Sequence, residues 1–201
     1  SGFTYEAGLS FAVGKDNVYT LSGSASWFDQ HVNDWIIWLP NFKGYYSPLN
    51  IKEVHAYGIE TEADLALRLA KNWKLGVHST FAWTPSINEG EPMSSADQSL
   101  GKQLPYVPEY SATLSGRLSY RRWSLFYTMT SNKKTLTGHL PHYLMSNVTL
   151  EKGFSLRWAD LSLKGTVNNL FNEEYLSVLS RPMPGINFEF FIGITPKWGK
   201  K

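Results

Sequence analysis

The stretch Tyr110–Tyr120, YSATLSGRLSY, alternates apolar and polar side chains along its whole length. Its even positions carry Tyr, Ala, Leu, Gly, Leu and Tyr, and its odd positions carry Ser, Thr, Ser, Arg and Ser. Because successive side chains of a strand point to opposite faces, this period of two predicts a long strand with one apolar and one polar face. After Arg121 and Arg122 the alternation resumes at Trp123, which predicts a hairpin with a two-residue turn.

The same alternation occurs on both sides of this hairpin. It is clearest at residues 73–84, 160–168 and 188–195, and further candidate strands cover residues 3–13, 18–38, 53–70 and 142–152. Together these segments predict an all-β chain of about nine long antiparallel strands.

The predicted strands are longer than those of most soluble proteins. Most reach about ten residues, whereas soluble strands usually have about five or six and strands that cross a bilayer need about nine to eleven. The connections are short at residues 14–17, 71–72 and 121–122 and long at residues 40–52, 86–104, 133–141 and 169–185. Outer-membrane barrels alternate short periplasmic turns with longer outer loops in this way. We therefore predict transmembrane strands of an outer-membrane barrel.

Aromatic residues are abundant, with 11 Tyr, 11 Phe and 8 Trp. Membrane barrels place such rings in girdles at the two lipid–water interfaces, near the ends of their strands. We expect this position for Trp27, Trp73, Tyr120, Trp123, Tyr127, Phe188 and Trp198.

Between residues 57 and 69 the alternation places several charges on one face. Glu60, Glu62, Asp64 and Arg68 share this face. Unpaired charges cannot fill a dry core, so the face must meet water or another polar protein element. A wide lumen meets this requirement, and we expect these four residues to line it. A soluble β-sandwich with a charged outer face explains the alternation equally well, but it explains the strand lengths and the loop order poorly.

The composition argues against several classes of function. The 19 basic and 17 acidic residues nearly balance, which disfavours a nucleic-acid partner. The absence of cysteine removes disulfides, zinc–thiolate sites, iron–sulfur clusters and thiol nucleophiles. The sequence contains no run of about 18 apolar residues, so no membrane helix is predicted. No signal-peptide pattern follows Ser1, which is expected of a mature or cut product. The common hydrolase, metalloprotease and phosphate-loop motifs are absent, so we expect neither an enzyme nor a bound cofactor.

Two segments near the C-terminus carry a family resemblance. Val167–Tyr175 reads VNNLFNEEY, and Arg181–Gly185 reads RPMPG before an apolar strand. They resemble the C-terminal end of TonB-dependent receptors of the Gram-negative outer membrane, where Asn-Leu-Phe closes the penultimate strand and a Pro-Gly loop precedes the last. Ile186 departs from the family, which commonly has Arg there. The resemblance implies a 22-stranded barrel around an N-terminal plug, and active import driven by the TonB complex pulling on that plug.

Two further segments resemble one branch of this family. Asp34–Pro40 reads DWIIWLP and Tyr46–Ile51 reads YSPLNI. Both look most like vitamin B12 receptors of the BtuB kind from Bacteroidetes. The resemblance implies cobalamin or another corrinoid as the favoured small-molecule cargo, with a siderophore or haem as alternatives.

About nine strands are too few to close such a barrel, and bacterial single-chain barrels have an even number of strands. We therefore expect residues 1–201 to be the C-terminal part of the receptor barrel, with the plug and the earlier strands outside this chain. Ser1 would lie in an outer loop, where a receptor is readily nicked or divided. The expected partners are the remaining barrel and plug of the same receptor, the TonB complex, outer-membrane lipid and a surface-exposed lipoprotein.

Cargo contacts should come from outer loops and upper lumen walls, because loops on a rigid scaffold commonly carry recognition. Aromatic rings offer a flat macrocycle a large contact area, and histidines could reach the metal of a haem or corrinoid. The candidates are Trp38, Phe42, Tyr45, Tyr46, Trp83, His139, His142, Tyr175 and Met183. The alternatives are girdle or loop-packing roles for the aromatic residues and ordinary surface positions for the histidines.

Three functions remain open. The favoured one is TonB-dependent import of a scarce metal chelate or cofactor. The second is a passive porin-like channel or adhesin barrel, which would need no plug. The third is a soluble secreted β-protein that binds sugar or protein, and it would stay in solution without detergent.

Overall fold

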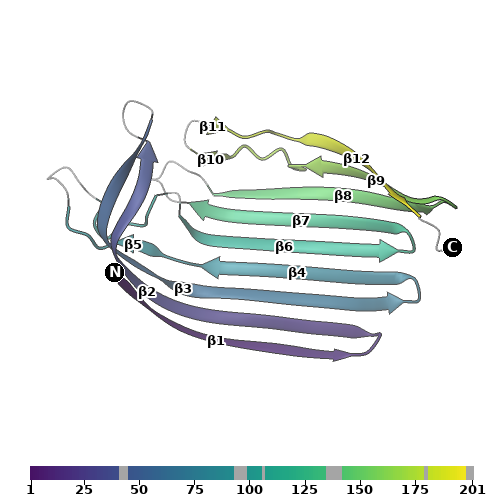
Figure 1. Ribbon diagram of the computed structural model, residues 1–201, viewed down its shortest axis with the longest axis horizontal. Helices are drawn as coiled ribbons and strands as arrows, with labels where there is room; N and C mark the ends of the chain where they lie inside the picture. The colour runs from purple at the N-terminus through teal and green to yellow at the C-terminus, as the bar shows by residue number, and fades with distance from the viewer. Residues whose placement is uncertain (41–44, 93–98, 106, 135–141, 179–180, 198–201) are drawn as a thin grey trace.

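The computed structural model describes residues 1–40, 45–92, 99–105, 107–134, 142–178 and 181–197. In this part of the chain nine long strands form one antiparallel sheet, and their order across the sheet is their order along the chain (Figure 1). They are β1 (Gly2–Lys15), β2 (Tyr19–Pro40), β3 (Tyr46–Ala70), β4 (Trp73–Trp83), β6 (Pro108–Tyr120), β7 (Trp123–Lys134), β8 (Tyr143–Ser155), β9 (Ala159–Asn168) and β12 (Asn187–Pro196). The prediction of an all-β chain with about nine long strands is confirmed. No helix among the described residues is long and apolar enough to cross a membrane.

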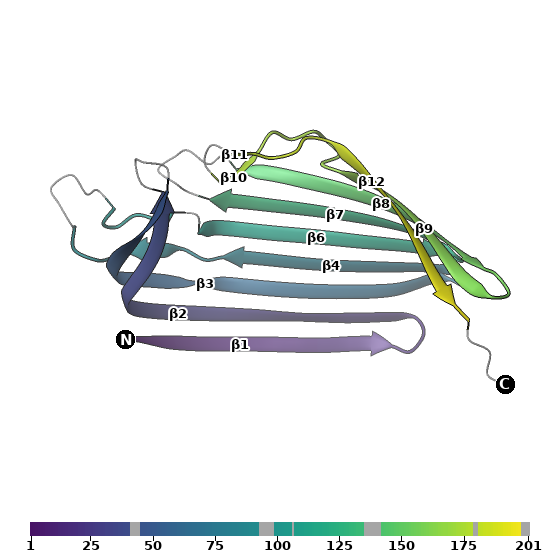
Figure 2. The same ribbon diagram turned by 45° about the horizontal axis from the view of Figure 1, so that its top comes forward.

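The connections are sorted between the two ends of the sheet, as the loop lengths predict. Figure 1 shows the tight turns β1–β2, β3–β4 and β6–β7 at one end, here named the turn end. Asn17 and Arg121 adopt positive φ values of 60° and 53° in two of these turns. The longer connections lie at the opposite end, here named the loop end. Figure 2 shows the sheet as a single curved layer.

Two connections that the sequence presents as long loops contain short strands. β5 (Ser86–Asn88) pairs with β3, where Asn88 lies opposite Val54. β10 (Leu176–Val178) and β11 (Arg181–Pro182) pair only with each other within the described residues. Residues 86–104 and 169–185 are therefore partly regular.

The prediction of a loop at residues 40–52 is wrong for most of its length. β2 continues to Pro40, β3 begins at Tyr46, and their pairing runs from Trp35 opposite Ile51 to Pro40 opposite Tyr46. Figure 1 shows this segment, the β2–β3 extension (residues 35–40 and 45–51), rising from the sheet. The proline residues suggest a loop, but Trp and Ile at residues 35–38 favour strand structure, and Pro is tolerated at strand ends.

The pairing register separates the residues into two faces, because cross-strand partners point to the same side. One row of partners reads Leu65, Val77, Gly116, Tyr127 and Val148. The neighbouring row reads Asp64, His78, Ser115, Thr128 and Asn147. The sheet therefore has an apolar face and a polar face, as the alternation predicts.

The apolar face is not covered by a second layer. Large apolar side chains on it stay exposed, including Leu9 at 68% and Phe190 at 87%. Among the described residues the buried hydrophobic ones are Val54, Leu104, Tyr143 and Ala159. A soluble β-sandwich would bury one whole face of each sheet, so this arrangement disfavours that alternative.

Aromatic residues form two rows across the apolar face. Near the turn end Trp73 lies opposite Tyr120 and Tyr120 opposite Trp123, and the rings of Trp73 and Tyr120 are 4.5 Å apart. Nearer the loop end the successive register partners are Trp27, Ile59, Trp83 and Tyr110. From Trp73 to Trp83 the strand rises about 34 Å, or about 26 Å along the membrane normal at a tilt of about 40°, which matches the apolar band of outer-membrane barrels.

Two of the expected girdle residues do not lie at strand ends. Trp27 lies within β2, because this strand continues past the aromatic row into the extension. Tyr127 lies within β7, where its hydroxyl is 3.0 Å from Ser146 Oγ. Phe188 does lie near the start of β12, and Trp198 falls outside the described residues.

Candidate functional site

The polar face carries a cluster of ionisable side chains near its centre. Glu62 and Asp64 alternate on β3, and His78 on β4 lies directly opposite Asp64. His78 Nδ1 is 2.9 Å from Asp64 Oδ1 and 3.9 Å from Glu62 Oε1. Between 41% and 54% of each of these side chains is exposed. The predicted pair of carboxylates therefore shares a face, and the register adds a histidine to it.

The other two predicted polar-face residues lie on either side of this cluster along β3. Glu60 lies opposite Ala82, towards the loop end, and Arg68 lies opposite Lys74, beside a register shift near the turn end. Arg68 contributes to a concavity of about 660 Å³ that is lined by several cations and by none of the carboxylates. Its cationic residues are Lys15, Arg68, Lys71, Lys74, Arg117 and Arg121. The polar face is thus acidic towards its middle and basic at the turn end.

Several aromatic candidates lie on or near the β2–β3 extension. Trp38 pairs with Pro48, and Tyr46 pairs with Pro40, so both belong to strands rather than to a loop. Trp38, Tyr45 and Tyr46 are 60%, 56% and 45% exposed. Phe42 lies outside the described residues. The extension therefore holds three accessible rings at the loop end.

Trp83 lies elsewhere, in the aromatic row of the apolar face opposite Ile59. Its ring packs edge-on against Tyr57, and its buried Nε1 has no hydrogen-bond partner among the described atoms. This position fits the girdle alternative given for the aromatic candidates.

The remaining candidates lie around the start of β8. His142 Nε2 is 2.8 Å from Ser131 Oγ, and the Tyr175 ring packs on Tyr143 at 4.8 Å. Met183 follows β11 and is 36% exposed. His139 lies outside the described residues. His142 thus contacts β7, and Tyr175 contacts β8.

The Asn-Leu-Phe segment has a clear local role. Asn169 is 2% exposed and adopts a positive φ of 51°, a conformation that Asn accepts more readily than most residues. Its Nδ2 donates to the carbonyl oxygens of Glu173 and Pro184, at 2.9 and 3.3 Å, and its Oδ1 accepts from the Glu173 N–H at 2.8 Å. Asn172 Oδ1 accepts from the Ile186 N–H at 2.9 Å. The two asparagines thus hold residues 169–173 next to residues 184–186.

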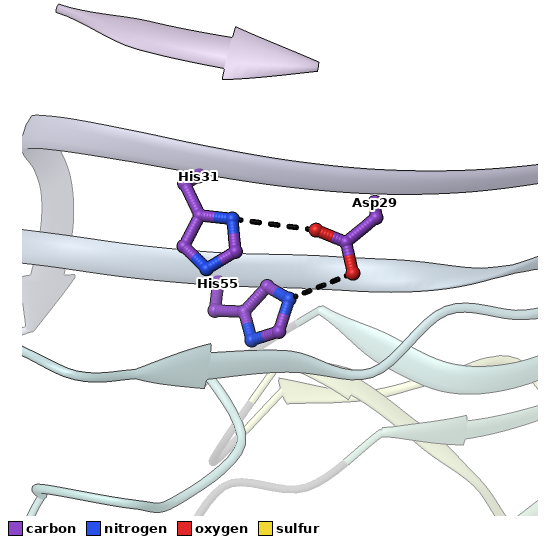
Figure 3. A group of neighbouring side chains, drawn as sticks. All are labelled: Asp29, His31 and His55. Carbon is purple, nitrogen blue, oxygen red and sulfur yellow. Dashed lines mark hydrogen bonds and ion pairs between the residues drawn. The ribbon is translucent and has the colours of Figure 1, made fainter. Parts of the chain in front are cut away.

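A second cluster was missed by the sequence analysis. Asp29 and His31 lie on β2, and His55 lies directly opposite His31 on β3 (Figure 3). Asp29 Oδ1 is 3.3 Å from His31 Nδ1, and Asp29 Oδ2 is 3.2 Å from His55 Nε2. The two imidazole rings stack with centroids 3.9 Å apart. The i, i+2 spacing of Asp29 and His31 is the available sequence signal, but His55 joins them only through the strand register.

Comparisons with known proteins give the family. The family model of the TonB-dependent receptor-like β-barrel matches residues 1–170. The fold is similar to that of the copper transporter OprC, with a TM-score of 0.62, 15% identity and coverage of 96% of this chain. It is also similar to the ferric-catecholate import receptor Fiu from K12 E. coli, with a TM-score of 0.58, 19% identity and 98% coverage. No curated protein matches the sequence.

This chain spans 31% of the length of OprC and 27% of the length of Fiu. OprC is named as a copper transporter and Fiu as an import receptor. The match to the family model covers most of the chain and agrees with its amphipathic antiparallel sheet. The chain therefore belongs to the β-barrel family of TonB-dependent receptors, which are outer-membrane proteins of Gram-negative bacteria.

Proposed function

We propose that residues 1–201 form the C-terminal barrel wall of an outer-membrane receptor that imports a scarce metal chelate or cofactor by TonB-dependent transport. The observation that carries this proposal is the open amphipathic sheet of a TonB-dependent receptor barrel. In this reading the apolar face meets lipid, the polar face lines the lumen, and the turn end is periplasmic.

The open edges of the sheet support the view that further strands of the same receptor complete the barrel. Within the described residues β1 pairs only with β2, and β12 pairs only with β9. In hydrocarbon every backbone N–H and C=O must be paired, so neither edge can stay open to lipid. The missing partners would be the earlier strands of a 22-stranded barrel, which is wide enough to hold a plug.

The charge pattern of the polar face supports contact with a plug. The acidic residues Glu60, Glu62 and Asp64 would face basic groups of the plug, and the basic concavity around Arg68 would face acidic ones. Charges at such an interface fix orientation more than they add affinity. The plug would be the part on which the TonB complex pulls.

Corrinoid is the first cargo to test, because the segments that resemble vitamin B12 receptors form the β2–β3 extension with its exposed rings. The same resemblance suggests a source in Bacteroidetes and a surface-exposed lipoprotein as partner. A siderophore or haem is the next choice. OprC and Fiu are named for copper and ferric catecholate, but their identity to this chain is too low to carry a cargo over.

The test uses the complete receptor, purified from outer membranes with any companion polypeptide. Cobalamin, a ferric catecholate and haemin are titrated against the receptor, its Trp38→Ala/Tyr46→Ala variant, and a Trp123→Ala control at the turn end. We expect cobalamin to bind, the double variant to lose at least tenfold in affinity, and the control to keep it. If the ferric catecholate or haemin binds instead, that ligand replaces cobalamin as the proposed cargo. A receptor that has no plug, binds none of the three ligands and conducts ions in a planar bilayer would favour a passive channel.

A further inference from the structure

The cluster of Asp29, His31 and His55 lies away from the proposed cargo path. Its residues have the same strand parity as Trp27 and Ile59, so they lie on the apolar face. They lie beyond the Trp27–Ile59 pair towards the loop end, at the base of the β2–β3 extension. In the proposed orientation this position is outside the hydrocarbon, at the level of the outer-leaflet headgroups.

The side chains are only partly exposed, at 27% for Asp29, 36% for His31 and 22% for His55. Aromatic rings enclose them from both sides. The Phe3 ring stacks on His31 at 4.8 Å, and the Tyr57 ring lies 4.9 Å from His55. The two imidazoles are therefore held in place by packing rather than free to rotate into solvent.

The hydrogen bonding of this cluster is incomplete: His55 Nε2 and Asp29 Oδ2 form a hydrogen bond of 3.2 Å, but within the described residues His31 Nδ1 lacks one. His31 Nδ1 is buried and has no hydrogen-bond partner among the described atoms, although it faces Asp29. Both nitrogens of His55 face carboxylates, with Nε2 near Asp29 and Nδ1 3.4 Å from Glu89 Oε1. A neutral imidazole has only one N–H, so one of these contacts would set a nitrogen lone pair against an anion. An N–H on both nitrogens of His55 would satisfy its two carboxylates but would leave the buried His31 Nδ1 without a partner, and charging both rings would stack two cations at 3.9 Å.

A divalent ion resolves this conflict. One donor atom from each of the three residues lies within 4.8 Å of the others. His31 Nδ1 lies 3.3 Å from Asp29 Oδ1 and His55 Nε2 lies 3.2 Å from Asp29 Oδ2, so each imidazole meets a different oxygen of the carboxylate. Both separations are close to about 3.4 Å, the distance between donor atoms around an ion with bonds of about 2.0–2.2 Å, so a carboxylate that binds through both oxygens could share one ion with the two rings. His55 could then donate its Nδ1–H to Glu89, the carboxylate–histidine–metal arrangement that orients metal-binding imidazoles.

We propose that Asp29, His31 and His55 bind a first-row transition-metal ion, Zn²⁺ or Cu²⁺, and that Glu89 orients His55. Two imidazoles and one carboxylate suit these borderline ions better than Mg²⁺ or Ca²⁺, which prefer oxygen ligands throughout. Three protein ligands leave a position for water or an external ligand. The ion would tie β2 to β3 at the base of the extension.

The cluster on the polar face offers an internal control. Glu62, Asp64 and His78 form the other group of potential ligands within the described residues. Its side chains are more exposed, at 41% to 54% against 22% to 36% in the first cluster, so water solvates them more fully. We therefore expect the ion to bind the first cluster and not this one.

The experiment uses the complete receptor in detergent, stripped of metal with a chelator and dialysed. Zn²⁺ is titrated by calorimetry, and one equivalent of Cu²⁺ is examined by electron paramagnetic resonance. The variants are His31→Gln, His55→Gln, Glu89→Gln and the control His78→Gln. Heat-dependent migration in a denaturing gel reports whether each variant is folded.

We expect the unsubstituted receptor to bind one equivalent of Zn²⁺. His31→Gln and His55→Gln should abolish this binding or weaken its affinity at least 100-fold, and His78→Gln should leave the affinity unchanged. Glu89→Gln removes no ligand and should weaken binding about 10- to 100-fold. The Cu²⁺ spectrum of the unsubstituted receptor should show two imidazole nitrogens. A spectrum without imidazole nitrogens, or equal Zn²⁺ binding by the ligand variants, would overturn the proposal, and neither result depends on which cargo the receptor carries.

Discussion

A charged substitution at each of two adjacent positions of β6 tests which face of the sheet meets lipid and which meets the lumen, because adjacent residues point to opposite faces. Leu114 points to the apolar face and is 36% exposed, whereas Ser115 points to the polar face opposite His78. Both lie near the middle of the strand between the girdle residues Tyr110 and Tyr120. Leu114 is four residues from Tyr110 and six from Tyr120, or about 14 and 20 Å along the strand and about 10 and 16 Å along the membrane normal at a tilt of about 40°. Leu114 is therefore close to the midplane of the hydrocarbon.

We expect Leu114→Arg to destabilise the complete receptor by about 2–4 kcal/mol, the cost of Arg on the lipid face at this depth. This corresponds to a change of about 30- to 1000-fold in the ratio of folded to unfolded receptor. Ser115→Arg places the same side chain at the same depth on the wet face and should change stability by less than about 0.5 kcal/mol.

Urea unfolding of the two variants in liposomes, followed by tryptophan fluorescence and heat-dependent gel migration, measures this difference. Equal destabilisation by both substitutions, or a larger effect of Ser115→Arg, would refute the assignment of the two faces.

The remaining predictions concern local packing and the outer segment. Gly58→Ala should destabilise by about 1–3 kcal/mol in the same urea assay, because a Cβ there would collide with the Trp83 carbonyl oxygen, whereas Gly76→Ala on the same face meets no atom within 4 Å and should be nearly neutral. Asn169→Ala should cost about 2–4 kcal/mol and speed proteolysis within residues 169–186, because three side-chain hydrogen bonds are lost. Asn169→Gly keeps the positive φ but not the bonds, so a fully stable Gly variant would show that backbone conformation alone is required.

The strands and their two faces could be predicted from sequence because period-two alternation is a local signal. Tyr110–Tyr120 alternates strictly and lies on one strand, with Leu114 and Ser115 on opposite faces. The loop prediction at residues 40–52 is wrong because the paired partners that stabilise the extension lie between 6 residues apart, at Pro40 and Tyr46, and 16 residues apart, at Trp35 and Ile51. A single sequence does not reveal such pairing.

The candidate sites were predicted only in part, for the same reason. Glu62 and Asp64 are two apart on one strand, so their shared face follows from the alternation alone. His78 and His55 join their clusters through cross-strand register, which local spacing does not encode. The separation of Trp83 from the aromatic extension likewise depends on the fold, because both occur next to long connections in the sequence.

Energised uptake tests the central claim of active import most directly. The cargo that binds in the titration, cobalamin first, is radiolabelled and supplied to cells that express the complete receptor, with and without a functional TonB complex. We predict that accumulation requires both the receptor and TonB and stops when the proton gradient is collapsed. Receptor-dependent accumulation that persists unchanged without TonB would contradict active import and support a passive channel.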